Sequence, residues 1–124
     1  MRDKKKILIV DDEEQLVMLL TARLSANNYN VVAAYDGVQA LEKVRTEKPD
    51  LIVLDIMLPK MDGYKVCRLL KFDARHKHVP ILIFSARAQE SDKTMAFEVG
   101  ADDYIVKPFE PETFLSKVKA LLDK

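Results

Sequence analysis

The sequence predicts an α/β fold in which five strands alternate with five helices, a (βα)5 arrangement built on an open parallel sheet. Three observations support this prediction. Short runs rich in β-branched residues recur along the chain, a helical spacing of apolar residues follows each run, and polar side chains stand where four of the runs end. Strands and helices that alternate in this way form a parallel sheet with helices on both faces.

The predicted strands are short, and four of them are almost continuously apolar. Such runs are typical of strands that are covered on both faces of a parallel sheet. Their sequences are KILIV (6–10), NVVAA (30–34), LIVLD (51–55), PILIFS (80–85) and DYIV (103–106).

The predicted helices are recognised by apolar residues that recur three or four positions apart. In chain order these are Leu16, Leu19, Leu20 and Leu24; Val38, Leu41 and Val44; Val66, Leu69 and Leu70; Met95 and Val99; and Phe114, Val118, Leu121 and Leu122. Residues at the helix ends agree with this division. Asp36 is placed to cap the second helix and Asp62 to start the third, Pro111 suits the first position of the fifth, and Gly100 follows the fourth where a left-handed residue is expected.

Length and composition indicate one globular domain over residues 1–124. Lys and Arg number 20, and Asp and Glu also number 20, so no basic excess points to direct nucleic-acid binding. Cys67 is the sole cysteine, which excludes an intrachain disulfide and favours a reducing compartment. The apolar run after the first lysines is too short for a signal peptide or a membrane span. We therefore expect a cytoplasmic protein that does not contact a membrane.

Five polar residues stand at the ends of the predicted strands. Asp11 and Asp12 follow the first strand, Asp55 ends the third, Ser85 ends the fourth, and Lys107 follows the fifth. Open α/β sheets bind ligands along this carboxyl edge. In the flavodoxin-like strand order 2-1-3-4-5 the first and third strands are neighbours, so the three aspartates would share one pocket.

A pocket with three carboxylates favours a cation, because like charges otherwise raise one another's pKa values. Mg²⁺ suits oxygen ligands and phosphate groups, and a carboxylate can act as a nucleophile to form an aspartyl phosphate. Lys107 and the Ser85 hydroxyl would then contact the phosphoryl oxygens. Each residue alone has a structural explanation as a cap, a turn former or a solvated charge, so the prediction depends on the joint pattern.

Four motifs together resemble the receiver domain of bacterial two-component response regulators, and the resemblance covers essentially the whole chain. They are VDDEE (10–14), LIVLDIMLPKMDG (51–63), ILIFSA (81–86) and GADDYIVKPF (100–109). The last motif is similar to the receivers of winged-helix transcription regulators. The resemblance implies a regulatory phosphoacceptor rather than an enzyme.

The resemblance also implies roles for individual residues. Asp55 would accept the phosphoryl group from a sensor histidine kinase or a phosphotransfer protein. Asp12 would bind Mg²⁺ directly and Asp11 mostly through water, while the main-chain carbonyl of Met57 would be a further ligand. Ser85 occupies the family's Ser/Thr position, and its hydroxyl turns toward the phosphoryl group.

Near the fifth strand, Lys107 corresponds to the family's lysine at the phosphoryl site. The Lys107–Pro108 bond would be cis, and Tyr104 matches an aromatic switch that moves inward when Ser85 is drawn to the phosphate. The fourth helix, fifth strand and fifth helix would then change shape to control an output domain or a target protein. Met57 and Arg87 would flank the phosphoryl group and hinder the approach of water.

The same surface pairs two receivers of the winged-helix regulators through charged residues. Asp102, Asp103, Lys93 and Lys117 match these positions, whereas the acid expected opposite Lys93 is replaced by Thr113. We therefore expect a monomer when unphosphorylated and at most a weak dimer when phosphorylated.

Three alternatives remain open at this point. A haloacid-dehalogenase-type phosphatase also uses an Asp nucleophile and Mg²⁺, although its nucleophile follows the first strand. A nucleotide-binding module has little support because neither glycine-rich phosphate loop is present. A receiver that acts only as an interaction surface, without phosphorylation, is the third. Elsewhere, His76 and His78 form an HxH pair that would need a further ligand to bind a metal, and Cys67 is expected in the core.

Overall fold

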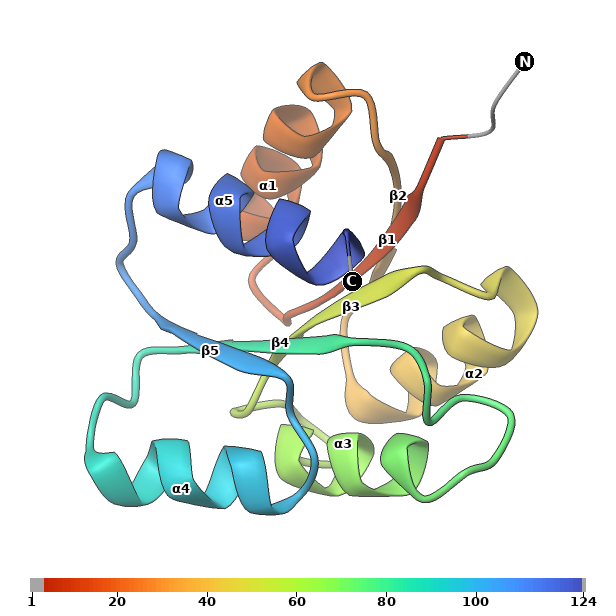
Figure 1. The fold of residues 1–124 in the computed structure, drawn as a ribbon, viewed down its shortest axis with the longest axis vertical. Helices are drawn as coiled ribbons and strands as arrows, with labels where there is room; N and C mark the ends of the chain where they lie inside the picture. Colours follow the sequence, from red (N-terminus) through yellow and green to blue (C-terminus); the bar gives the residue numbers. More distant parts are fainter. Residues whose placement is uncertain (1–3, 124) are drawn as a thin grey trace.

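The computed structural model describes residues 4–123, so the ends of the predicted 1–124 domain lie outside the described part. Five parallel strands form one sheet in the order β2-β1-β3-β4-β5, which confirms the predicted fold class (Figure 1). The strands are β1 (Lys6–Val10), β2 (Asn30–Ala34), β3 (Leu51–Asp55), β4 (Ile81–Ser85) and β5 (Asp103–Val106). The helices are α1 (Glu14–Ala26), α2 (Gly37–Glu47), α3 (Gly63–Lys71), α4 (Glu90–Glu98) and α5 (Pro111–Leu122).

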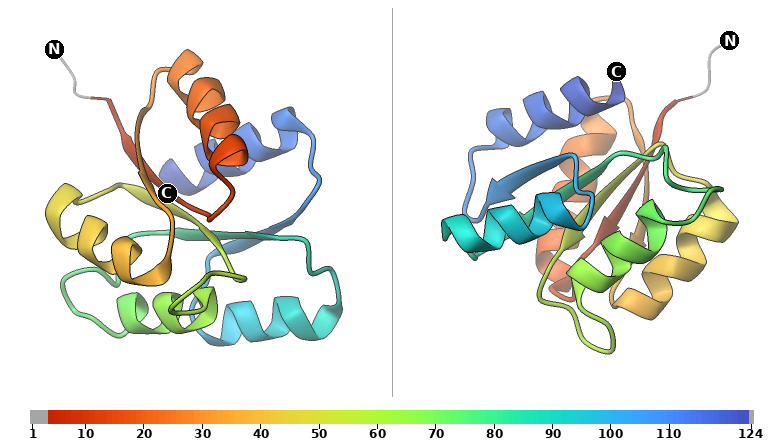
Figure 2. Two further views of the ribbon diagram at one scale, coloured as in Figure 1. Left: turned by 180° about the vertical axis from the view of Figure 1, so that it is seen from behind. Right: turned by 60° about the horizontal axis from the view of Figure 1, so that its bottom comes forward.

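The helices cover the sheet in two layers. Helices α1 and α5 lie on one face, and α2, α3 and α4 lie on the other (Figures 1 and 2). Each layer has its own apolar core. One contains the inward side chains of α1 and α5, and the second, larger core contains those of the other three helices. Because every residue of β3 and β4 is buried, the sheet's middle is rigidly packed and fixes the positions of the residues at its carboxyl edge.

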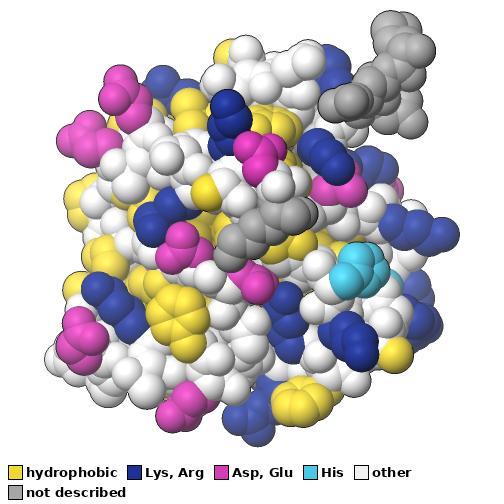
Figure 3. Space-filling view, in the orientation of Figure 1, with side chains coloured by type: hydrophobic (Ala, Val, Ile, Leu, Met, Phe, Trp, Pro, Cys, Tyr) yellow, Lys and Arg dark blue, Asp and Glu magenta, His cyan; other side chains and the backbone are white. Residues whose placement is uncertain are grey.

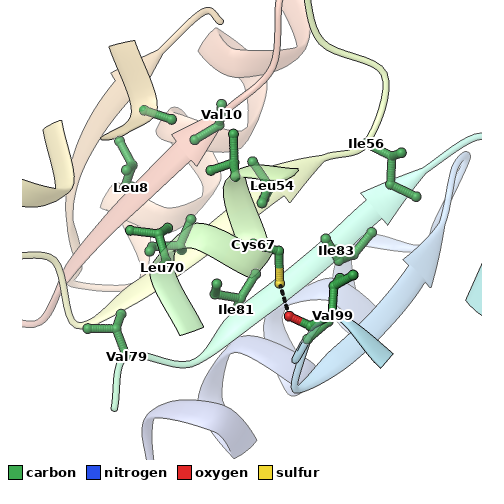
Figure 4. Packing of buried hydrophobic residues seen from close by; sticks show 14 of the residues in the cluster. Leu8, Val10, Leu54, Ile56, Cys67, Leu70, Val79, Ile81, Ile83 and Val99 are labelled. Atoms are coloured by element: carbon green, nitrogen blue, oxygen red, sulfur yellow. Dashed lines mark hydrogen bonds between the residues drawn. The ribbon is translucent and has the colours of Figure 1, made fainter. Parts of the chain in front are cut away.

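Cys67 lies in the larger core, as expected. Its thiol is fully buried and donates a hydrogen bond to the Val99 carbonyl, 3.6 Å away, at the end of α4 (Figure 4). Burial raises the pKa of this thiol to about 12. The contact ties α3 to the end of α4.

The expected capping residues are observed. The Asp36 carboxylate accepts a hydrogen bond from the Gln39 N–H at the start of α2, and the Asp62 carboxylate accepts one from the Lys65 N–H at the start of α3. Pro111 is the first residue of α5. Gly100 has φ +103°, a conformation that L side chains rarely adopt, and ends α4 in a Schellman pattern of hydrogen bonds.

Two details differ from the sequence prediction. Strand β4 begins at Ile81 rather than Pro80, because proline has no N–H to donate to a neighbouring strand. The helices also turn some of the periodic residues outward: Leu19, Val38, Leu69 and Met95 are 59, 50, 44 and 42 % exposed. Small or β-branched neighbours such as Val17, Ala40 and Ala96 are buried instead, so spacing alone located the helices but not their buried faces.

The surface carries mixed charge. On the face seen in Figure 3, acidic and basic side chains are interspersed with small apolar areas, in keeping with the equal numbers of the two charges. Within residues 4–123, no helix has the length and apolar character needed to cross a membrane.

Candidate functional site

The site lies at the carboxyl edge of the sheet, at the left of Figure 1. Val10 pairs with Leu54 in register, so Asp11 leaves β1 beside Asp55, the last residue of β3. The Asp11 N–H donates to the Ala34 carbonyl over 3.1 Å, which extends the β1–β2 ladder by one residue and holds the start of the loop. The order of the strands, rather than the sequence distance, therefore brings these carboxylates together.

Asp11, Asp12 and Asp55 each place a carboxylate oxygen so that the three atoms lie within 4.8 Å of one another. Asp11 and Asp55 are buried, whereas Asp12 is exposed. The Asp11 carboxylate also accepts the Glu13 N–H over 2.9 Å, which fixes its orientation. The structure thus combines two buried, hydrogen-bonded carboxylates with one that faces solvent.

Lys107 supplies the positive charge of the cluster. Its Nζ lies 2.7 Å from Asp11 Oδ2, 3.3 Å from Asp55 Oδ2 and 3.8 Å from Glu13 Oε1. The ammonium also stands 4.5 Å from the centroid of the Phe84 ring, in a cation–π contact. Burial opposes the charged form of Lys107, but the bonds and charges of Asp11 and Asp55 outweigh it, so the pKa of this lysine is raised.

The surroundings of Asp55 disfavour the ionised form of its carboxyl group. Burial raises the pKa of its carboxyl above the ordinary value, and the charge of Asp11 adds to this rise. The charge of Lys107 and the Met57 N–H, which donates to Asp55 Oδ1 over 3.2 Å, oppose the rise only in part. A carboxylate that is poorly solvated and close to a like charge gains from any additional cation.

Ser85 and Tyr104 lie on the other side of the site. The buried Ser85 Oγ accepts a hydrogen bond from the Arg87 N–H over 3.2 Å. The Tyr104 hydroxyl donates to the Arg87 carbonyl over 2.8 Å, and its ring is turned inward with 7 % of the residue exposed. Burial raises the pKa of Tyr104 above its ordinary value.

Pro108, Met57 and Arg87 are the remaining residues that the sequence predicted at or near the site. The Lys107–Pro108 peptide bond is cis. Met57 and Arg87 line one open hollow of about 540 Å³ together with Tyr64 and the loop that follows Asp55.

Sequence reasoning missed several residues that shape the site. Gly63, the first residue of α3, lies directly against the backbone of Asp55 and donates its N–H to the Ile56 carbonyl over 2.7 Å. Phe84 lies beneath Lys107, and Asp92 of α4 lies near Arg87. The motif MDG, with a glycine directly after the helix cap, was the one available signal for the first of these.

The donor set fits Mg²⁺. Its oxygens are all carboxylates, and one of the three, Asp12, is exposed, so a hard cation can retain waters there. Within residues 4–123 this is the sole cluster of three or more such ligands, so the HxH pair of His76 and His78 gains no third ligand in the described region.

A family model described as the response regulator receiver domain matches residues 7–119. The chain belongs to this family. A receiver domain is a regulatory module and not a catalytic enzyme, so the phosphatase and nucleotide-binding alternatives fall away.

Named relatives agree with this assignment. The chain is 52 % identical over 118 residues to the alkaline phosphatase synthesis transcriptional regulatory protein of Bacillus subtilis, covering 95 % of this chain and 48 % of the relative. It is 43 % identical over 117 residues to the DNA-binding dual master transcriptional regulator RpaA of Synechocystis, covering 94 % and 48 %. The receiver thus spans about half the length of these relatives, and the likeness to receivers of transcription regulators is confirmed.

Solved structures extend the comparison. The BeF3-activated N-terminal receiver domain of RstA from Klebsiella pneumoniae is 33 % identical with a TM-score of 0.88, covering 97 % of this chain and 100 % of that one. A response regulator from Chloroflexus aurantiacus is 36 % identical with a TM-score of 0.93, covering 98 % and 99 %.

Proposed function

We propose that this receiver is the phosphoacceptor domain of a two-component regulator, with Asp55 as the residue that takes the phosphoryl group. The proposal rests mainly on one observation. The buried Asp55 carboxylate has Lys107 Nζ 3.3 Å away and the Asp11 and Asp12 carboxylates within the same 4.8 Å cluster. Its raised pKa marks a carboxylate that gains from reaction or from a cation.

In the proposed step, one Asp55 oxygen attacks the phosphorus of a phosphohistidine on the donor protein. The O–P bond forms as the P–N bond breaks, and the departing imidazole nitrogen keeps the electron pair and takes a proton from water. Oδ1 accepts the Met57 N–H and Oδ2 faces Lys107, so the carboxylate is held in one orientation before reaction. Such preorganisation replaces reorientation at the moment of transfer.

Asp12 would hold Mg²⁺ directly and Asp11 mostly through water, while Asp55 and the Met57 carbonyl would be further ligands. When bound, the ion would supply charge neutralisation for the transferring phosphoryl group. Asp11 suits a water-mediated role because one of its oxygens already accepts the Glu13 N–H and the other faces Lys107. The exposed Asp12 is the more accessible ligand.

Lys107 and Ser85 would contact the phosphoryl oxygens once the group is on Asp55. Lys107 already lies between Asp11 and Asp55, so it can shift from one anion to the other with little movement. The Ser85 hydroxyl would turn toward the phosphate and loosen its bond with the Arg87 N–H. Tyr104 would stabilise this arrangement from its inward position beside α4, and α4, β5 and α5 would transmit the change to an output domain or target.

The donor would dock beside α1. An apolar groove of about 500 Å³ runs between α1 and the start of α5, and it is lined by Leu16, Leu19 and Phe114 among others. The groove reaches Lys107 at the acceptor site, and Leu19 is exposed. These features suit the apolar face of a helix that carries the phosphohistidine. A sensor histidine kinase, or a phosphotransfer protein, in the cytoplasm is the corresponding partner of this single receiver domain.

The proposal is tested by incubating the protein with acetyl phosphate and Mg²⁺ and measuring phosphorylation by intact mass spectrometry. We expect one phosphoryl group per chain, lost on hydroxylamine treatment and absent without Mg²⁺. Asp55→Asn should abolish it, whereas the matched control Asp73→Asn, on a loop distant in the fold, should not. A phosphoryl group retained in Asp55→Asn would refute the assignment, and a folded wild type that never reacts would favour a receiver that acts only through its surface.

A further inference from the structure

Arg87 occupies a central place beside the acceptor site. Its N–H donates to Ser85 Oγ and its carbonyl accepts from Tyr104 Oη, so its backbone joins the two residues that would respond to phosphorylation. Its guanidinium points elsewhere: Nη1 lies 3.7 Å from Asp92 Oδ1. The Arg87 side chain is 48 % exposed and the Asp92 side chain is 17 % exposed, so Asp92 is the more firmly held of the two.

Asp92 is itself held from two directions. Its Oδ2 accepts the Gln89 N–H over 3.3 Å in the capping box of α4, and its carbonyl accepts the hydroxyl of Tyr64, on α3, over 3.1 Å. Burial and the charge of Asp92 raise the pKa of Tyr64, while Arg87 opposes this rise, so the three groups lie in one electrostatic environment. Arg87 is therefore bound to a point fixed by both α3 and α4.

The Arg87 side chain forms one wall of the hollow beside the acceptor. Met57 forms another wall, and its N–H holds Asp55 Oδ1, which places the hollow next to the reacting carboxylate. Water that approached a phosphoryl group on Asp55 through this hollow would pass between these two side chains. An Arg87 guanidinium held at Asp92 would leave water less room there than one free to move into solvent.

We propose that Asp92 is a positioning residue that holds Arg87 across the hollow and thereby slows the hydrolysis of phosphorylated Asp55. In that hydrolysis a water oxygen attacks phosphorus, the O–P bond to Asp55 breaks, the aspartate leaves as a carboxylate, and the water proton goes to the released phosphate or to solvent. Asp92 touches none of these atoms and acts only through Arg87. The inference rests on the proposed phosphorylation of Asp55.

The ion pair between Arg87 and Asp92 should have a modest effect on the rate of hydrolysis. Partly exposed ion pairs are worth about 0–1 kcal/mol, which corresponds to a change in rate of up to about five-fold. We expect Asp92→Asn to speed the loss of the phosphoryl group about two- to five-fold. Arg87→Ala removes the wall itself and should speed it at least as much.

The test is a double-mutant cycle on the decay of the phosphorylated protein. Wild type, Asp92→Asn, Arg87→Ala and the double variant are phosphorylated with acetyl phosphate, desalted, and followed by intact mass spectrometry. Because Asp92 acts through Arg87, Asp92→Asn should speed decay in the wild-type background and have no effect in the Arg87→Ala background. Asp73→Asn, which breaks an exposed pair with Arg75, is the matched control and should decay like wild type.

Two results would overturn the inference. Decay that is unchanged or slower in Asp92→Asn would show that the tether does not restrict water. An equal acceleration in both backgrounds would assign the effect to the lost helix cap instead of to Arg87. A wild type that cannot be phosphorylated would overturn the proposed function as well, so the two failures are distinguishable.

Discussion

Replacing Gly63 by alanine should displace the backbone of the acceptor residue, Asp55. A Cβ at this position would lie 2.7 Å from the Ile56 Cα and closer still to the Asp55 carbonyl oxygen. Both neighbours are backbone atoms, so no side-chain rotation relieves the overlap. Because non-bonded carbon atoms rest about 3.5–4.0 Å apart, the loop between β3 and α3 must move by roughly 1 Å.

Two magnitudes follow from this displacement. Overpacking of this kind costs about 1–3 kcal/mol of unfolding free energy, out of about 5–15 kcal/mol for a typical domain, so the variant should remain folded at 25 °C. A shift of about 1 Å in a reacting group can slow a reaction by about 10²-fold. We therefore expect Gly63→Ala to lose rate out of proportion to its loss of stability.

Urea unfolding and the rate of phosphorylation by acetyl phosphate measure the two effects separately. Gly100→Ala is the matched control, since its φ of +103° also makes alanine costly but it lies away from Asp55, against the Lys71 side chain. It should lose stability and keep its rate. A wild-type rate in Gly63→Ala, or an equal slowing in both variants, would refute the reasoning.

Three further predictions concern charge. The folded state raises the pKa of Asp55 above its ordinary value of 3.8, so the carboxylate destabilises the fold progressively as pH rises from about 4 through the raised pKa. Asp55→Asn should therefore resist urea better than wild type at pH 7, and the advantage should vanish below about pH 4. Mg²⁺ affinity measured by calorimetry should fall further in Asp12→Ala than in Asp11→Ala, and equal affinities would contradict the direct role of Asp12. Sedimentation should show a monomer without a phosphate mimic and at most a weak dimer with BeF3, and a tight dimer of the unmodified protein would refute this view. Thr113→Glu should strengthen the association by restoring a pair with Lys93, worth about 0–1 kcal/mol and counted twice by symmetry.

The intramolecular contacts of this surface agree with weak pairing. Lys117 Nζ lies 3.1 Å from Asp103 Oδ2, and Lys71 Nζ lies 2.8 Å from Asp102 Oδ2 within one chain. The Asp102 carboxylate also accepts the Ile81 N–H over 2.8 Å. Charged side chains that already form ion pairs within one chain contribute less to binding a second chain.

The sequence was sufficient to predict the strands and the residues at their carboxyl ends, and the strand order came from the flavodoxin-like fold class that they indicate. Apolar runs such as LIVLD carry this information because strands buried on both faces tolerate almost no polar residue except at their ends. Asp11, Asp55 and Lys107 then follow from topology, since neighbouring parallel strands end at the same edge.

The buried helix faces and the supports of the site were not predictable in the same way. Leu19 is exposed while Val17 is buried, because the inward stripe of α1 runs through Val17, Leu20 and Leu24. This stripe has the same spacing of three and four as the predicted one, so spacing alone does not choose between them. The ion pair of Arg87 with Asp92 depends on how α4 packs beside the loop after β4. Both residues have ordinary sequence contexts, so the pair emerges only from the fold.

The single, buried thiol of Cys67 can serve as a probe of how often α3 separates from the end of α4. Burial raises the pKa of Cys67 to about 12, so the thiol is protonated at neutral pH, and its sulfur is shielded between α3 and the end of α4. A thiol reagent can therefore label it only during moments when these helices separate. The labelling rate would time the opening of the α3–α4 layer in solution without any added probe, and a difference between the free and phosphorylated protein would reveal whether the signal loosens this layer or tightens it.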